Sequence, residues 1–250
     1  MIKEFKVLSD HGKQFVKDLR NQPVSDRFRG LPVISEKITE DEIKEVSVLC
    51  PVNAINRQSG AIDLGRCAFC NECALLMPDR IRFTNDYRIA SNKRDDLIIS
   101  PGQTGFLRID ETVVRKDIRR LFKRALKLRE VSAGGDNSGE MELAATGNVN
   151  FDFGRYGVEF VASPRHADGI VITGPVTENM AKALEICYDA VPSPKVIILA
   201  GSDAISGGIF DGSPALNRSF INSHYIDLYV PGNPAHPLTF INGVMDLLGI

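Results

Sequence analysis

The second half of the chain alternates short apolar runs with segments that repeat at helical spacing. The short runs are rich in β-branched residues and have the length of buried strands. They lie at 127–131, 158–161, 169–173, 196–199 and 225–230, and the helical segments lie at 140–150, 178–190 and 238–248. This alternation predicts a parallel sheet with helices on both faces, whose functional sites lie beyond the carboxyl ends of the strands.

A basic amphipathic helix is predicted between Asp110 and Ala125, with carboxylates near its start. The apolar positions of its inner face are Val114, Ile118, Leu121, Phe122 and Ala125. The basic residues of its other face are Arg115, Lys116, Arg119, Arg120, Lys123 and Arg124. Such a helix either contacts anionic lipid headgroups or an acidic partner subunit, or is a solvated link between two domains. Its apolar content is too low for stable membrane anchoring by itself.

Charge and length exclude several classes of protein. The 250 residues carry a formal net charge of -2, whereas a general nucleic-acid binder needs a basic surface, so no DNA or RNA partner is expected. The N-terminus lacks the apolar core of a signal peptide, and no run approaches the roughly 20 apolar residues of a membrane-spanning helix. We therefore expect a cytoplasmic location.

The cysteines point to iron–sulfur chemistry in a reducing compartment. Cys67, Cys70 and Cys73 follow the spacing C-x2-C-x2-C, at which one short loop places three thiolates around an iron–sulfur cube. The fourth ligand is expected from Cys50, which is followed by a proline. The fifth cysteine, Cys187, is interpreted as a packing residue on a helix.

These cysteines resemble half of the ligand set of a two-cluster bacterial ferredoxin. In that family the run C-x2-C-x2-C-x3-C-P occurs twice, and the last cysteine of each run binds the cluster of the other run. The positions of the second ligand set fall on Glu40, Ile43, Val46 and Met77, none of which is a cysteine. The resemblance therefore implies one [4Fe-4S] cluster bound by Cys50, Cys67, Cys70 and Cys73, and the alternative is a four-cysteine zinc site.

The C-terminal half resembles the small subunit shared by complex I and membrane-bound, energy-converting [NiFe] hydrogenases. The most specific part of the resemblance is the segment from Phe160 to Asp168, followed by the stretch from Thr173 to Thr177. Shorter matches occur at 194–195, 207–210 and 230–232, and the segment 26–34 resembles ferredoxin-type subunits of the same assemblies. The resemblance implies a domain that holds a proximal [4Fe-4S] cluster, which passes electrons to quinone or to a nickel–iron centre.

This chain departs from the family at the proximal-cluster ligands. By the resemblance, the four ligand positions fall on Asp136, Gly139, Asp203 and Asn233, so none of them offers sulfur. An ordinary proximal cluster cannot assemble there, because its irons need thiolates. The vacated site is expected to hold either a hydrogen-bonded polar plug, which we favour, or a hard cation such as magnesium or calcium.

Together these features predict an α/β protein with a flavodoxin-like parallel sheet domain at 126–250. A smaller α+β ferredoxin-like domain at 1–105 precedes it, and a basic linker helix at 106–125 joins the two. We predict an electron-transfer subunit of a membrane-associated complex, with a hydrogenase- or complex I-like large subunit and membrane-arm subunits as partners. A ferredoxin-type donor is a further possible partner, and the protein would lie peripherally at the inner membrane. The alternative is a non-catalytic assembly or coupling subunit with a structural cluster, and catalysis by this chain alone is not expected.

Overall fold

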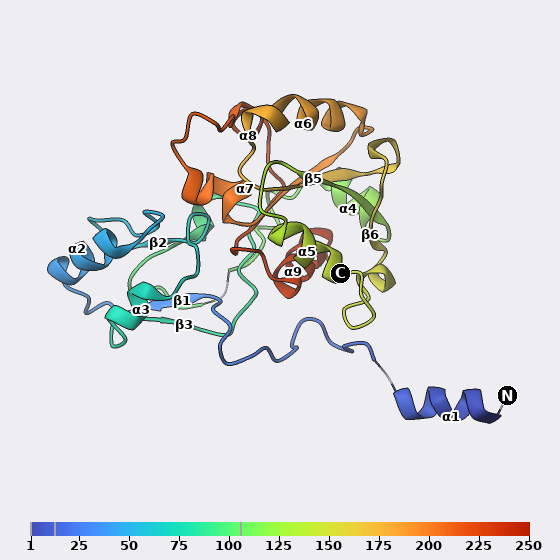
Figure 1. Cartoon of the computed structure of the whole chain (residues 1–250), viewed down its shortest axis with the longest axis horizontal. Coiled ribbons are helices and arrows are strands. Elements are labelled where there is room, and N and C mark those ends of the chain that lie inside the picture. Colours follow the sequence, from blue (N-terminus) through green and yellow to red (C-terminus); the bar gives the residue numbers. More distant parts are fainter. Residues whose placement is uncertain (1, 13, 106) are drawn as a thin grey trace.

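Five parallel strands form the central sheet of the C-terminal half. The computed structural model describes residues 2–12, 14–105 and 107–250, and Figure 1 shows the arrangement of its elements. The strands are β5 (Leu126–Ser132), β6 (Val158–Phe160), β7 (Gly169–Thr173), β8 (Val196–Ala200) and β9 (Leu228–Val230). They are hydrogen-bonded in the order β6-β5-β7-β8-β9, and every neighbouring pair is parallel. This is the strand order of flavodoxin-like folds, which confirms the predicted fold class.

Helices cover both faces of this sheet because its strands are apolar on both sides. Every residue of β7 and β8 is buried, as expected for parallel strands between two helical layers. The helices that pack on one face are α4 (Lys116–Phe122), α5 (Ser138–Ala145) and α9 (Pro237–Leu248). Those on the other face are α6 (Glu178–Ala190), α7 (Ser202–Ser206) and α8 (Ser219–Ser223). Single 3-10 turns lie at η1 (Asp95–Leu97), η2 (Phe153–Tyr156), η3 (Pro164–His166) and η4 (Gly208–Phe210).

The N-terminal half is a small α+β unit, as predicted. Strand β1 (Pro32–Ile34) pairs antiparallel with β3 (Ile81–Phe83), and β2 (Ile62–Asp63) pairs antiparallel with β4 (Ile98–Ile99). Its helices are α2 (Glu40–Leu49) and α3 (Glu72–Leu76), while α1 (Ile2–His11) extends away from the rest of the chain in Figure 1.

The two halves share one hydrophobic core rather than being joined only by a linker. A single buried cluster includes Ile34 and Leu64 of the N-terminal half together with Ile170 and Leu199 of the sheet. A short antiparallel bridge between Ser91 and Tyr229 also joins the N-terminal half to the edge strand β9. The cysteine-bearing half is therefore held in a fixed position beside the sheet.

The middle helix is shorter than predicted and belongs to the α/β domain. It spans only Lys116–Phe122, because Arg115 has extended backbone and pairs with the buried carboxylate of Asp227 at 2.9 Å. Ile118 and Phe122 are buried against the α9 side of the sheet. The helix predicted at 140–150 likewise ends at Ala145, and β9 lacks the first three residues of the strand predicted at 225–230. Within the described ranges, no helix has the length and apolarity needed to cross a bilayer.

Candidate functional site

The predicted ligands Cys50, Cys67, Cys70 and Cys73 lie around one small pocket, which we call the cysteine pocket. Cys50 ends α2, Cys73 lies in α3, and the other two lie in the loop before α3. The rest of the lining is almost entirely apolar and includes Val52, Ala54, Ile55, Ile62, Ala68 and Phe83. The structure therefore brings together side chains that lie on separate elements of the N-terminal half.

The loop around this pocket turns its backbone amides toward the thiols. The amide of Ala54 donates to Sγ of Cys50 at 3.2 Å, and the amide of Phe69 donates to Sγ of Cys67 at 3.3 Å. Phe69 achieves this with a positive φ of 52°, which is uncommon for a residue with a side chain. Amide donors of this kind stabilise negative charge on sulfur and are among the features that tune iron–sulfur centres.

Burial favours the protonated form of the thiols of Cys67 and Cys73. Burial first, and then the charges of the neighbouring cysteines, raise the pKa of Cys67 to about 12 and that of Cys73 to about 11. Cys67 and Cys73 are therefore protonated at neutral pH, and any metal that bound them would have to displace their protons. In the described parts of the chain, no three histidine, cysteine or carboxylate side chains are close enough to hold a single metal ion.

The cysteine loop is fastened directly to the α/β domain. The hydroxyl of Ser202, at the start of α7, donates to the carbonyl of Cys67 at 2.6 Å, and this hydroxyl is buried. The guanidinium of Arg66 pairs with Asp211 at 2.7 Å. From the N-terminal segment, Arg29 donates to the carbonyl of Cys70 at 3.2 Å. No sequence pattern marks Ser202, whereas Arg29 lies in the segment 26–34 that resembled ferredoxin-type subunits.

The positions predicted to have lost the proximal cluster also meet in one place. Asp136, Gly139, Asp203 and Asn233 all line a second pocket, which we call the strand-end pocket. Asp136 and Gly139 follow β5, Gly139 in the first turn of α5, while Asp203 follows β8 in the first turn of α7 and Asn233 follows β9. These positions lie at the carboxyl ends of the strands, where parallel α/β sheets place their ligands.

The two aspartates of the strand-end pocket, Asp136 and Asp203, differ in their hydrogen bonds and in the direction of their pKa shifts. Asp136 accepts hydrogen bonds from the hydroxyl and the amide of Ser138, at 2.6 and 2.9 Å, and these lower its pKa. Burial, and next the charge of Asp136, raises the pKa of Asp203. Oδ1 of Asp203 is buried without a hydrogen-bond partner among the described residues, and it points at Gly208. A side-chain carbon at Gly208 would lie 1.8 Å from that oxygen, so the turn needs glycine there.

A third pocket lies between the two sites. It has a volume of about 230 Å³, and its lining includes Phe69 of the cysteine loop and Asn233 of the strand-end pocket. Phe28 contacts His236 edge-to-face across it, with ring centroids 5.0 Å apart. The cysteine pocket and the strand-end pocket are therefore close neighbours in the fold.

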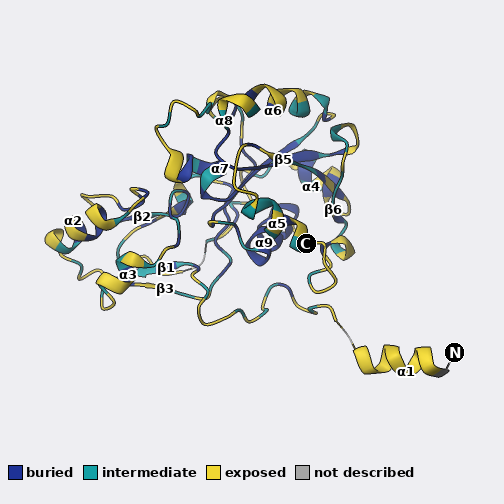
Figure 2. Ribbon diagram, in the orientation of Figure 1, coloured by how far each residue is buried: buried dark blue, intermediate teal, exposed yellow. Residues whose placement is uncertain are grey.

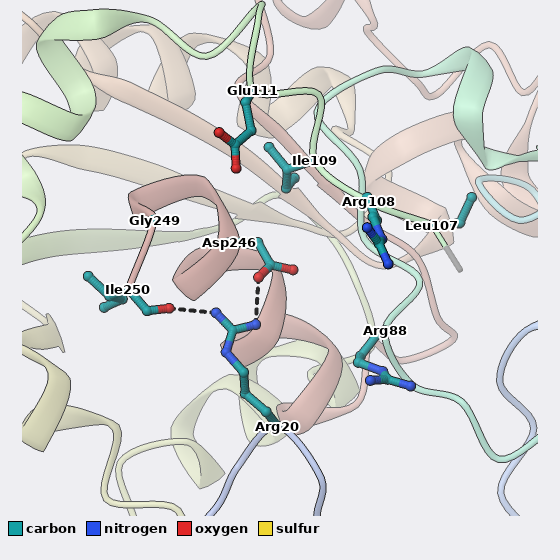
Figure 3. A pocket seen from close by; sticks show the side chains of 9 residues that line it. All are labelled: Arg20, Arg88, Leu107, Arg108, Ile109, Glu111, Asp246, Gly249 and Ile250. Carbon is teal, nitrogen blue, oxygen red and sulfur yellow. Dashed lines mark hydrogen bonds and ion pairs between the residues drawn. The ribbon is translucent and has the colours of Figure 1, made fainter. Parts of the chain in front are cut away.

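A larger pocket of about 520 Å³ lies beside the C-terminal end of α9 and is lined by several charged side chains. Figure 3 shows that Arg20 reaches Asp246 and the carbonyl of Ile250, both at 2.5 Å. Arg88 donates to Asp86 at 2.9 Å. Since these two guanidinium groups already have partners, we do not assign a functional site to this pocket.

Comparison with known proteins identifies the C-terminal half. The family described as NADH ubiquinone oxidoreductase, 20 Kd subunit, matches residues 137–247. The N-terminal cysteines lie outside that match.

Three curated relatives agree with this match. The probable membrane-bound hydrogenase subunit mbhJ of Pyrococcus furiosus is 35% identical over 115 residues, which cover 46% of this chain and 69% of the relative. An NADH-quinone oxidoreductase subunit of Geotalea daltonii is 39% identical over 43% of this chain and 62% of its own length. Formate hydrogenlyase subunit 7 of Escherichia coli is 33% identical over 57% of this chain and 56% of its own length.

A solved chain from the membrane-bound sulfane sulfur reductase, an archaeal respiratory membrane complex, is 26% identical, with a TM-score of 0.46. It matches 53% of this chain and 73% of its own length. The match spans less than two thirds of the length of several curated relatives. The sheet, the matched residues and the hydrogenase relative together show that the chain belongs to the family of the 20 kDa subunit of NADH ubiquinone oxidoreductase.

Proposed function

We propose that this protein is an electron-transfer subunit that carries one [4Fe-4S] cluster in the cysteine pocket. The observation that carries the proposal is the meeting of Cys50, Cys67, Cys70 and Cys73 around one apolar pocket. Four thiolates in an apolar setting are the donor set of such a cube, and the bound cube would supply reversible one-electron chemistry.

The alternative occupant of the cysteine pocket is a single zinc ion. A zinc ion needs all four sulfurs about 2.3 Å from one point. In a cube each thiolate binds a different iron atom, so the four cysteine sulfurs lie farther from one another than they do around a single zinc ion. The amides that donate to Cys50 and Cys67 would hold the thiolates in place after their protons leave.

We further propose that the α/β domain docks partner subunits without holding a proximal cluster. The residues at the strand-end pocket are two aspartates, a glycine and an asparagine, and these do not fit an iron–sulfur cube because they offer no thiolate. They form a polar plug in which Asp136 is already hydrogen-bonded. The partners would be a large subunit like those of hydrogenases or complex I and membrane-arm subunits, with this chain on the cytoplasmic side, peripheral to the inner membrane.

The loss of ligands at the strand-end pocket favours a second candidate, an assembly or coupling subunit whose cluster is structural. The two candidates differ in whether the cluster changes oxidation state. A structural cluster would show no reversible reduction in the physiological range, whereas an electron carrier would.

Anaerobic iron and acid-labile sulfide analysis of the purified protein tests both candidates. We expect four iron and four sulfide per chain, and loss of both in a Cys67→Ser variant. Cys187→Ser is the matched control and keeps the wild-type content. One tetrahedral zinc in place of iron contradicts both candidates, and a redox titration followed by electron paramagnetic resonance then separates the carrier from the structural role.

A further inference from the structure

An exposed apolar patch lies beside the cysteine pocket. Val48 and Leu49 end α2 with exposed fractions of 69% and 41%, and Leu75 and Leu76 of α3 are 68% and 43% exposed. The two helices are in contact. Figure 2 shows both as largely exposed ribbons at the end of the molecule away from the sheet. We call these four residues the α2–α3 patch.

The patch lies where electrons could cross between the pocket and solvent. Leu49 directly precedes Cys50, which caps the C-terminal end of α2, and Leu75 follows Cys73 of α3 by two residues, so each helix has a cysteine of the pocket in it or at its end. Cys70 is exposed, whereas Cys67 is buried and fastened to Ser202 of the α/β domain. Cys67 therefore lies on the side of the pocket that faces the α/β domain, whereas Cys50 and Cys73 lie at the two helices that bear the patch.

The charges around the patch specify what can cover it. Glu45 and Glu72 each lie one helical turn before apolar residues of the patch and form its acidic rim, whereas Glu40, Asp41 and Glu42 lie in the first turn of α2 and Lys44 pairs with Asp41. Glu42 is paired with Arg80, while Glu45 and Glu72 are exposed. An acidic rim repels anionic lipid and a second copy of the same surface. It attracts a protein that surrounds an apolar contact area with lysines and arginines.

We propose that the α2–α3 patch docks a one-electron carrier protein with a basic rim. Exposed apolar groups of this kind mark interaction sites, and interfaces between redox proteins are small and transient. One electron would pass between the carrier and the cube, so that one partner is oxidised as the other is reduced and no bond forms or breaks. The inference rests on the proposed cluster and adds the kind of partner that exchanges electrons with it.

Binding of oxidised cytochrome c, a basic one-electron carrier, to the oxidised full-length protein tests the patch without turnover. We expect a Val48→Gln, Leu75→Gln variant to raise the dissociation constant about tenfold, as for the loss of a buried contact centre. A Glu45→Gln, Glu72→Gln variant should also weaken binding at low salt, and added salt should weaken wild-type binding, because the rim acts through screened charges. The matched controls on α6, Ile186→Gln and Glu185→Gln, should bind as wild type does.

Stopped-flow oxidation of the reduced protein by cytochrome c gives a second readout. The patch variant should slow this reaction while leaving oxidation by a small neutral dye unchanged. The inference would be overturned if the Val48→Gln, Leu75→Gln variant and the Glu45→Gln, Glu72→Gln variant both bound cytochrome c with the wild-type dissociation constant. Stronger binding after loss of the rim carboxylates would also overturn it. Iron and sulfide analysis of the same samples distinguishes failure of the docking proposal from failure of the proposed cluster. Four iron atoms per chain, together with variants that bind cytochrome c as the wild type does, would contradict only the docking proposal. Absence of iron would contradict the proposed cluster.

Discussion

Glu130 gives the α/β domain a pH-dependent stability. Its carboxyl lies on β5, and burial, followed by the nearby charge of Glu140, raises its pKa from 4.5 to about 7. Glu140 lines the strand-end pocket and accepts a hydrogen bond from Thr173 at 2.7 Å. The native protein therefore keeps a proton on Glu130 over a pH range in which the unfolded chain has lost it.

Replacement of Glu130 by glutamine should stabilise the protein at pH 8 and change little at pH 5. Because the folded pKa is raised to about 7, wild-type stability from this group is full below pH 4.5 and is lost as the pH rises through 7. The gain at pH 8 is at most about 3 kcal/mol, and smaller because the carboxyl is only half-buried. Anaerobic urea unfolding at the two pH values measures it, with Glu185→Gln on α6 as the control. An equal effect of Glu130→Gln at both pH values would show that the raised pKa is not the cause.

At the scale of single residues, the sequence could predict the cysteines that line the pocket but not the side chains that hold their loop in place. The spacing of Cys67, Cys70 and Cys73 predicted which side chains would meet, because cube-binding loops have a fixed spacing. Ser202 lies 135 residues from Cys67, and a serine at the start of a helix has many ordinary roles. Its hydrogen bond to the Cys67 carbonyl depends on how two halves of the chain pack, which no local pattern encodes.

Helix α2 occupies the segment in which two-cluster ferredoxins carry their other cysteine run. Its start is fixed by a capping box, in which the amide of Glu42 donates to the Thr39 hydroxyl and the amide of Thr39 donates to Glu42. Two of the expected ligand positions, Ile43 and Val46, are buried in the core beneath the helix. A regular, capped helix therefore directs these two positions into the core and not toward a common point outside it.

Cysteines restored at the ferredoxin positions should therefore fail to build a second cluster. The variant replaces Glu40, Ile43, Val46 and Met77 by cysteine, and we expect it to keep four iron atoms per chain. The helix directs the side chains at 43 and 46 into the core, while position 40 is exposed, so the four sulfurs cannot surround one cube. Iron and sulfide analysis after anaerobic reconstitution measures the outcome, and eight iron atoms per chain would contradict it.

At the scale of elements, prediction succeeded where burial alone decides the structure. Helix α6 and strand β7 begin and end at the predicted residues, because their apolar periodicity is uninterrupted. Helix α4 is shorter than its periodic pattern because Arg115 leaves helical geometry to reach Asp227 and the carbonyl of Lys195. An ion pair between residues 112 positions apart cannot be read from local spacing.

At the scale of the whole molecule, sheet topology explains why the strand-end pocket could be foreseen, whereas the position of the cysteine loop against the sheet domain could not. Asp136, Asp203 and Asn233 follow strands of one parallel sheet, so their loops must meet at its carboxyl edge. The cysteine loop has no such constraint. Its position against α7 follows from the shared core and from the Arg66–Asp211 pair, which join halves that the sequence suggested were separate domains.

The strand-end pocket should accept a cluster when cysteines occupy the four positions proposed from the family resemblance. A variant with cysteine at Asp136, Gly139, Asp203 and Asn233 should bind eight iron and eight sulfide per chain after anaerobic reconstitution, because the three segments that carry these residues converge on one pocket. The tightest replacement is at Gly139, where a side-chain carbon would lie 3.3 Å from the Thr173 methyl group and displace it by a few tenths of an ångström. The α2 variant carries the same number of added cysteines and is the matched control for non-specific iron. A content of four iron in both variants would mean that the loops no longer hold the geometry of their relatives, whereas eight in the strand-end variant alone would show that only the ligands were lost.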